Sequence, residues 1–185
     1  KAIRRQRQMC IRDSGKGGRF VKKEQLVRHE FEPVYDKNSE ILILGSFPSV
    51  KSREQGFYYG HPQNRFWKVL AAIAQEKIPD SIEEKKEMLL RNHIAVYDVI
   101  WQCKITGSSD SSIKDVVPAD ITTIVELSKI RKIYANGKLA EKLFSKYQEK
   151  KVGIKAIGLP STSPANAAYS LERLVEIWSE QIKQK

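Results

Sequence analysis

Short apolar runs alternate with amphipathic segments from residue 40 to the end of the chain. The run at 41–44, Ile-Leu-Ile-Leu, is continuously apolar, which predicts a strand covered on both faces. Similar short runs at 94–98, 132–135 and 154–157 predict three further strands.

Segments with helical periodicity separate these runs. Residues 66–74 and 138–147 have apolar positions at helical spacing, and Asp120 can cap a helix that runs through residue 127. Ser81 and Glu84 form a capping box that opens a helix towards Arg91. Pro164 fits the first turn of a final helix, whose buried face is marked by Leu171, Leu174, Val175 and Trp178.

Strands separated by helices need crossover connections, which predicts a four-stranded parallel sheet with helices on both faces, a three-layer α/β/α domain. In such sheets ligands bind beyond the carboxyl ends of the strands. The segments expected to hold a site are therefore 45–65, 101–115, 136–138 and 159–167.

The first 28 residues lack a hydrophobic period and are predicted to be a disordered leader, which leaves 29–185 as one folded domain. The leader has no apolar core typical of a secretory signal. An organelle-targeting peptide and a non-native extension both remain open as explanations.

The formal net charge is +11, but residues 1–28 contribute +8 of it and the domain only +3. Charge therefore gives little independent support for a nucleic-acid partner. No apolar run approaches the roughly 18 residues that a membrane span requires. The two cysteines, Cys10 and Cys103, form no metal-ligand motif, so the sequence offers neither a zinc site nor the four cysteines of an iron–sulfur cluster. So few cysteines favour a reducing compartment.

The segment Gly45-Ser46-Phe47-Pro48-Ser49 directly follows the first strand, and a glycine there lets the backbone approach a ligand closely. A plain strand-to-loop turn is the alternative. The spacing matches neither a dinucleotide fingerprint nor a phosphate-binding loop.

An aromatic loop follows at 56–64. Tyr59 is the candidate for stacking on a base, whereas Phe57 and Tyr58 could equally anchor the loop to the core. The amide of Asn64 could hold a water or merely cap the next helix. Glu54, just before this loop, is the only acid available as a general base, so hydrolysis would depend on positioning more than on proton abstraction.

The segment after the fourth strand offers three hydroxyls, from Ser161, Thr162 and Ser163, between two prolines. Hydroxyl donors and free amides at a helix start suit a phosphate, although a capped helix start with solvent-facing serines is the alternative. Lys138 follows a glycine and could reach a phosphate or lie in a plain turn. The serine-rich stretch 108–112 is expected to be a solvated loop.

These residues together carry a family resemblance. Gly45-Ser46-Phe47-Pro48, Ser52, the block 59–67 (Tyr-Gly-His-Pro-Gln-Asn-Arg-Phe-Trp) and 159–164 (Leu-Pro-Ser-Thr-Ser-Pro) resemble the uracil-DNA glycosylase superfamily, most closely its hypoxanthine-DNA glycosylase branch. The resemblance runs from about Phe31 to Trp178 and has no counterpart for the leader. Mismatch-specific uracil glycosylases carry an Asn where this sequence has Ser46.

The resemblance implies an enzyme that flips a deaminated nucleotide out of DNA and hydrolyses its N-glycosidic bond. It implies that Asn64 takes over the catalytic role of the Asn that is missing at position 46. Ser46 and His61 are expected to belong to the same catalytic group. Gly45, Phe47 and Tyr59 would surround the base, and Ser161, Thr162, Ser163 and Lys138 would hold the flanking phosphates.

No lysine occupies a matching position for an amine nucleophile, so the enzyme is expected to leave an abasic site without cutting the strand. Neither a metal nor a cofactor is expected. The expected partner is DNA with a deaminated base, bound by a monomer in the cytoplasm of a prokaryote or in the nucleus. A mismatch-specific uracil glycosylase and a non-catalytic nucleic-acid-binding module are the competing hypotheses.

Overall fold

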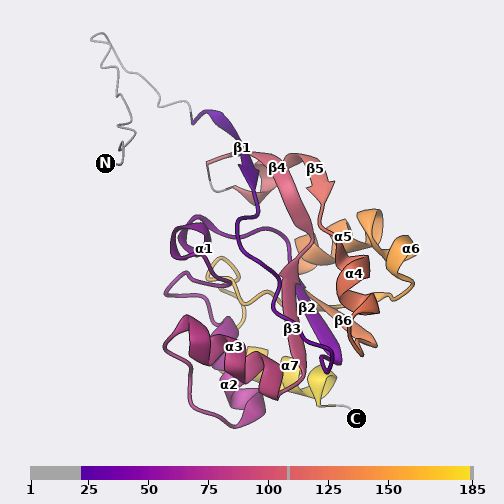
Figure 1. Ribbon diagram of the computed structural model, residues 1–185. Helices are drawn as coiled ribbons and strands as arrows, with labels where there is room; N and C mark the ends of the chain where they lie inside the picture. Colours follow the sequence, from indigo (N-terminus) through magenta and orange to yellow (C-terminus); the bar gives the residue numbers. More distant parts are fainter. Residues whose placement is uncertain (1–21, 108, 184–185) are drawn as a thin grey trace, which may run out of the picture.

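Four parallel strands form the central sheet of the computed structural model, which describes residues 22–107 and 109–183 (Figure 1). Their order across the sheet is β3-β2-β6-β7, and every neighbouring pair is parallel. The bounds are β2 (Ile41–Gly45), β3 (Ile94–Asp98), β6 (Lys132–Asn136) and β7 (Ala156–Leu159). The side chains of Leu42, Ile43 and Leu44 are fully buried, as a strand covered on both faces requires.

Helices cover both faces of this sheet. Figure 1 shows α2 (Phe66–Ala74), α3 (Ile82–Arg91) and α7 (Leu171–Ile182) on one side and α4 (Ile121–Glu126), α5 (Lys138–Tyr147) and α6 (Glu149–Val152) on the other. A short helix, α1 (Val50–Gln55), follows β2. The predicted three-layer α/β/α architecture is confirmed.

The predicted caps also form. Ser81 accepts a hydrogen bond from the amide of Glu84, and Asp120 accepts one from the amide of Thr123. These side chains satisfy amides that have no partner inside the helix, which fixes where α3 and α4 begin.

A second, antiparallel sheet was not predicted. It has the order β1-β4-β5, with β1 (Glu24–Arg28), β4 (Ile100–Thr106) and β5 (Lys114–Pro118), and a 3₁₀ turn (Asp110–Ser112) lies between the last two. The sequence interpretation treated 101–115 as a loop beyond the second strand. Two register shifts between β4 and β5 disturb the alternation of apolar and polar positions that would have indicated these strands.

The prediction of a disordered leader through residue 28 is wrong for its last five residues. β1 pairs with β4 from Glu24 opposite Thr106 to Arg28 opposite Gln102. Most of its side chains are exposed, so backbone hydrogen bonds rather than burial hold the strand, and the sequence shows no apolar period. The rest of the predicted leader, residues 1–21, lies outside the described residues.

Two predicted starts move. The fourth strand begins at Ala156 rather than at Ile154, because its ladder starts where Ala156 pairs with Ile133. The final helix begins at Leu171, capped by Ser170, and not near Pro164. Residues 164–169 form turns.

Candidate functional site

A cavity of about 820 Å³ opens at the carboxyl edge of the parallel sheet. Volumes of this order are typical of small-molecule sites, and this edge is where open α/β sheets bind ligands. All four segments expected to hold a site contribute walls, and the segment 101–115 does so with the tip of the β4–β5 hairpin. The lining residues include Gly45, Ser46, Phe47, Tyr59, His61, Asn64, Asp98, Ile105, Ser109, Asn136, Lys138, Ser161, Thr162 and Ser163.

The turn after β2 forms one wall. The carbonyls of Gly45 and Ser46 accept hydrogen bonds from Val99 (2.9 Å) and Ile100 (3.0 Å), so the turn remains fastened to the chain that follows β3. Phe47 is half-buried and lines the cavity. The predicted residues of this motif thus lie together at the site.

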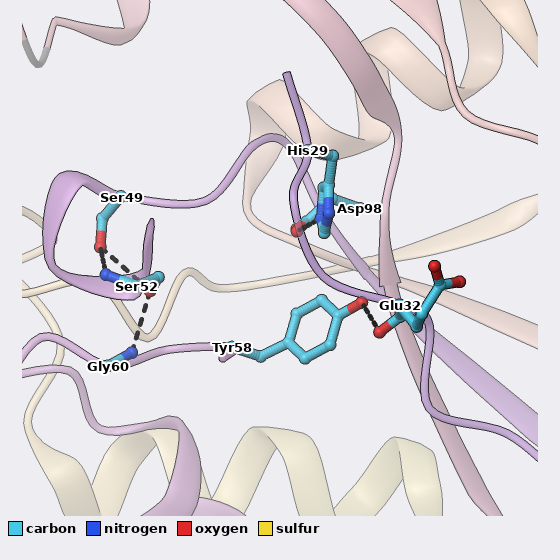
Figure 2. A network of polar contacts seen from close by, with 7 residues as sticks. All are labelled: His29, Glu32, Ser49, Ser52, Tyr58, Gly60 and Asp98. Atoms are coloured by element: carbon cyan, nitrogen blue, oxygen red, sulfur yellow. Dashed lines mark hydrogen bonds and ion pairs between the residues drawn. The ribbon is translucent and has the colours of Figure 1, made fainter. Parts of the chain in front are cut away.

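Serine side chains fix the next part of this wall (Figure 2). Ser49 caps α1 by accepting a hydrogen bond from the amide of Ser52 (3.1 Å). The hydroxyl of Ser52 in turn accepts one from the amide of Gly60 (2.9 Å). Ser52 therefore ties α1 to the start of the His-Pro-Gln-Asn block.

The three neighbouring aromatics have different roles. Phe57 and Tyr58 are buried in the core, which favours the anchoring alternative for both. Tyr59 lines the cavity and has a left-handed backbone conformation (φ 52°). One face of its ring stacks on Phe66, with the centroids 3.9 Å apart, so only the other face is open to a base.

Asn64 is held in one orientation by two donors. Its Oδ1 accepts hydrogen bonds from the backbone amide of Phe66 (2.9 Å) and from the hydroxyl of Thr162 (2.9 Å). An amide nitrogen donates only, so the Phe66 contact identifies which end of the side chain is oxygen. Among the described residues nothing accepts from Asn64 Nδ2, which leaves both of its hydrogens for a ligand or water.

Thr162 does not fit the expected phosphate contact. Its side chain is fully buried, and its hydroxyl donates to Asn64 and accepts from Asn136 Nδ2 (3.0 Å). The amide of Thr162 also donates to Asn136 Oδ1 (3.0 Å). Thr162 therefore braces Asn64 from behind the cavity wall, a role that needed the unpredicted partner Asn136.

Arg65 fastens the segment that carries these hydroxyls. Its guanidinium donates to the carbonyls of Ser163 (2.9 Å), Asn166 (3.0 Å) and Tyr169, and its Nε donates to that of Thr162 (3.4 Å). These contacts hold residues 162–169 as turns, and the final helix begins only at Leu171, where Ser170 caps it.

The remaining phosphate candidates lie on the cavity wall. Ser161 and Ser163 are half-buried, and Lys138 is exposed at the first position of α5. Gly137, with φ 95°, turns the chain so that the free amides at the start of this ten-residue helix face the same cavity. The helix N-terminus adds positive potential to the hydroxyls and the lysine.

His61 lines the cavity and has a defined ring orientation. Its Nδ1 accepts a hydrogen bond from the amide of Gln63 (3.1 Å). A neutral imidazole in this orientation carries its proton on Nε2, where it is a donor.

Besides Asn136, two further residues of the site were missed by sequence reasoning. Asp98, the last residue of β3, lines the cavity although it is only 4% exposed, and its Oδ2 accepts from Nε2 of the buried His29 (2.7 Å). An acid at the end of a predicted buried strand was the available signal for Asp98. His29 gave none, because it stands beside the predicted leader.

The charge of Asp98 affects the tyrosines around it. Burial, and after it the charge of Asp98, raises the pKa of Tyr97 to about 12, and the same two causes raise the pKa of Tyr59 further. These phenols therefore remain protonated donors at neutral pH.

No cluster of three or more His, Cys, Asp or Glu side chains suited to a metal occurs in the described part of the chain. Within residues 22–107 and 109–183, no helix is long and apolar enough to cross a membrane.

Comparisons with known proteins agree with this geometry. The family model of the uracil DNA glycosylase superfamily matches residues 32–181. A protein of Methanosarcina acetivorans named hypoxanthine DNA glycosylase is 36% identical over 152 residues, covering 80% of this chain and 94% of that protein. One of Methanosarcina barkeri with the same name is 34% identical over 157 residues, covering 83% and 96%.

A solved structure has the same fold. A solution NMR structure from Methanosarcina acetivorans, described as a candidate uracil DNA glycosylase, superimposes with a TM-score of 0.74 at 34% identity and covers 86% of this chain and 98% of that one. The resemblance predicted from the three sequence motifs is thus confirmed over nearly the whole described fold. This chain belongs to the uracil DNA glycosylase superfamily.

Proposed function

We propose that this protein is a DNA glycosylase that flips hypoxanthine out of DNA and hydrolyses its N-glycosidic bond, leaving an abasic site. The observation that carries the proposal is the cavity in which Asn64, Tyr59 and the turn at Gly45 converge. The names of the two Methanosarcina relatives support hypoxanthine as the base. Ser46, where mismatch-specific uracil glycosylases carry Asn, argues in the same direction.

Asn64 is proposed to orient the attacking water. Its Oδ1 already accepts two hydrogen bonds, so the side chain acts on the water through Nδ2 as a donor. It positions the water and takes no proton from it. Such positioning suffices where the sugar develops oxocarbenium character before the water attacks.

The leaving base needs stabilisation as it gains negative charge. We assign this to backbone amides of the turn at Gly45 and Ser46 and to the Nε2–H of His61, a residue that lines the cavity. The open face of Tyr59 would stack on the base, with Phe47 on the cavity wall beside it. No step requires a metal or an amine nucleophile.

The flanking phosphates are proposed to lie against Ser161, Ser163 and Lys138. Their hydroxyls and ammonium group, together with the start of α5, form a donor-rich edge at the cavity mouth. Thr162 supports this edge from behind through Asn64 and Asn136.

The test is excision from duplexes that carry deoxyinosine, deoxyuridine or deoxyxanthosine, followed by alkali to reveal abasic sites. Asn64→Asp keeps an acceptor for Phe66 and Thr162 but removes both Nδ2 hydrogens. It should slow the excision of hypoxanthine about 100-fold or more while the protein stays folded. Gln63→Glu makes the same change on an exposed side chain of the same loop and should remain within about threefold.

Other outcomes decide between the hypotheses. Preferential release of uracil would identify a mismatch-type uracil glycosylase. Binding to every duplex without alkali-sensitive sites would identify a non-catalytic module. Strand breaks before the alkali treatment would contradict hydrolysis without strand cleavage.

We also propose that the protein acts as a monomer, because the residues assigned to the water, the base and the phosphates all meet at a cavity within a single chain. Light scattering of the protein alone and on a short duplex tests this: a 1:1 complex is expected, and a 2:1 complex would contradict it. The enzyme would work where the DNA is, in the cytoplasm of a prokaryote or in the nucleus.

A further inference from the structure

A carboxylate lies at the floor of the cavity. Asp98 ends β3 directly opposite Gly45 of β2, where the two strands reach the carboxyl edge of the sheet. Its side chain is almost fully buried yet borders the cavity. A buried carboxylate is costly unless it has partners, so its position requires an explanation.

One partner is His29, and it holds only one of the two carboxylate oxygens. His29 and Asp98 lie against each other (Figure 2), and Nε2 of His29 donates to Asp98 Oδ2 at 2.7 Å. The imidazole has no exposed surface. The rings of Phe31 and Tyr97 pack against it, with centroids 4.5 and 5.0 Å away. The imidazole is therefore fixed, and it fixes the carboxylate.

The other oxygen, Oδ1, lies on the side of Gly45. A methyl group on Gly45 would overlap it, so the glycine keeps this oxygen uncovered. Within residues 22–107 and 109–183, no group donates a hydrogen bond to Oδ1. The hydroxyl of Tyr59, 3.1 Å from the place that such a methyl group would take, also lacks a partner there.

We propose that His29 positions Asp98 so that its Oδ1 accepts the ring N–H of the flipped base, and that this pair selects bases that carry a lactam N–H. The inference rests on the proposed glycosylase function. A carboxylate accepts hydrogen bonds and donates none. Adenine and cytosine present a ring lone pair at the position where their deaminated products, hypoxanthine and uracil, present an N–H. The pair therefore detects the chemical change that deamination makes.

The depth of Asp98 determines which part of the nucleotide it meets. A flipped base enters such a pocket with the edge that is remote from the sugar leading. The sugar and phosphates remain at the mouth, beside the exposed Lys138 and the half-buried Ser161. Asp98 at the floor thus faces the Watson–Crick edge. Guanine also carries a ring N–H, so this pair separates deaminated bases from adenine and cytosine only.

The first experiment removes the N–H from the substrate. Single-turnover excision is compared for deoxyinosine, 1-methyldeoxyinosine and the purine deoxyriboside that lacks both N1–H and O6. The wild-type protein should process the two analogues at least about 100-fold more slowly than deoxyinosine. Equal rates would overturn the inference while leaving the glycosylase function intact. Failure to release hypoxanthine from deoxyinosine would overturn both.

The second experiment assigns the selectivity to Asp98. Asp98→Ala removes the acceptor and leaves room for the methyl group, so the preference for deoxyinosine over 1-methyldeoxyinosine should fall below about tenfold. Asp98→Asn keeps the shape but offers both a donor and an acceptor. It should reduce the preference over the purine deoxyriboside by at least about tenfold. An unchanged preference in a folded Asp98→Asn protein would exclude Asp98 as the selecting residue.

The third experiment separates positioning by His29 from mere stability. His29→Gln retains an N–H at a similar reach and should keep the preference within about threefold, whereas His29→Leu should lose it. Tyr134→Phe deletes a different buried hydrogen bond, to the carbonyl of Gln181 (2.8 Å), away from the cavity. It should lower the melting temperature and leave the preference unchanged. If His29→Leu behaved in the same way, His29 would be a structural residue only.

Discussion

Four carbonyl groups of the segment 162–169 converge on the side chain of Arg65. Five N–H donors in a fixed plane make arginine suited to this task, and a lysine could satisfy only part of the set. The arginine of the His-Pro-Gln-Asn-Arg block is thus a scaffold residue, and it joins the two sequence motifs of the family in space.

Removing this side chain should loosen the segment that carries Ser161 and Ser163. Arg65→Ala removes all four side-chain hydrogen bonds to this segment and should lower the free energy of unfolding by about 2–4 kcal/mol, measured by urea denaturation. Lys68→Ala, one turn later on an exposed position of α2, should change it by less than about 0.5 kcal/mol. Equal effects would show that Arg65 contributes no more than a surface charge.

Gly45 is the other residue whose identity follows from a close approach. In Gly45→Ala the new methyl group would overlap Asp98 and press on the hydroxyl of Tyr59, both of them buried. Excision should therefore fall about 100-fold. Gly158→Ala is the matched control, because the atoms nearest to its methyl group would all belong to the end of the flexible Glu141 side chain. A Gly45→Ala protein with normal excision would contradict the tight packing at the cavity floor.

At the scale of elements, β1 should contribute to stability although it buries little. It covers one edge of β4 with a five-residue ladder. A chain that starts at residue 29 should melt about 5–10 °C below one that starts at residue 22, measured by circular dichroism. Equal melting temperatures would show that the strand adds nothing to the fold.

Sequence patterning predicted the central sheet because its strands are buried on both faces and because α3 and α4 carry clear caps. The second sheet escaped prediction for physical reasons: β1 is nearly all exposed, and β4 is bulged against β5. The site, too, was predicted only in the part that its sequence motifs reveal. Asn64 and the turn at Gly45 lie in contiguous motifs, whereas the buried pair of His29 and Asp98 joins residues 69 positions apart.

At the scale of the whole molecule, the positive charge is concentrated outside the described fold. Residues 1–21 carry seven Lys or Arg and one Asp, a net +6 of the total +11. Contacts between such charges and DNA phosphates release counterions. These contacts therefore strengthen binding to DNA at low salt, but they do not select a base.

A chain that starts at residue 22 should therefore bind undamaged DNA more weakly, and the slope of log Kd against log salt should decrease by about 2–4. Single-turnover excision at saturating enzyme should not change. An unchanged slope would mean that residues 1–21 make no phosphate contacts, and loss of excision would mean that they form part of the site.

The family model begins at residue 32, three positions after His29. A protein trimmed to the matched range would keep the parallel sheet, Asn64 and Asp98, yet it would leave Asp98 buried without its donor. The range that the family model matches therefore omits one residue of the proposed selecting pair. Expression of this protein should retain the residues from His29 onwards.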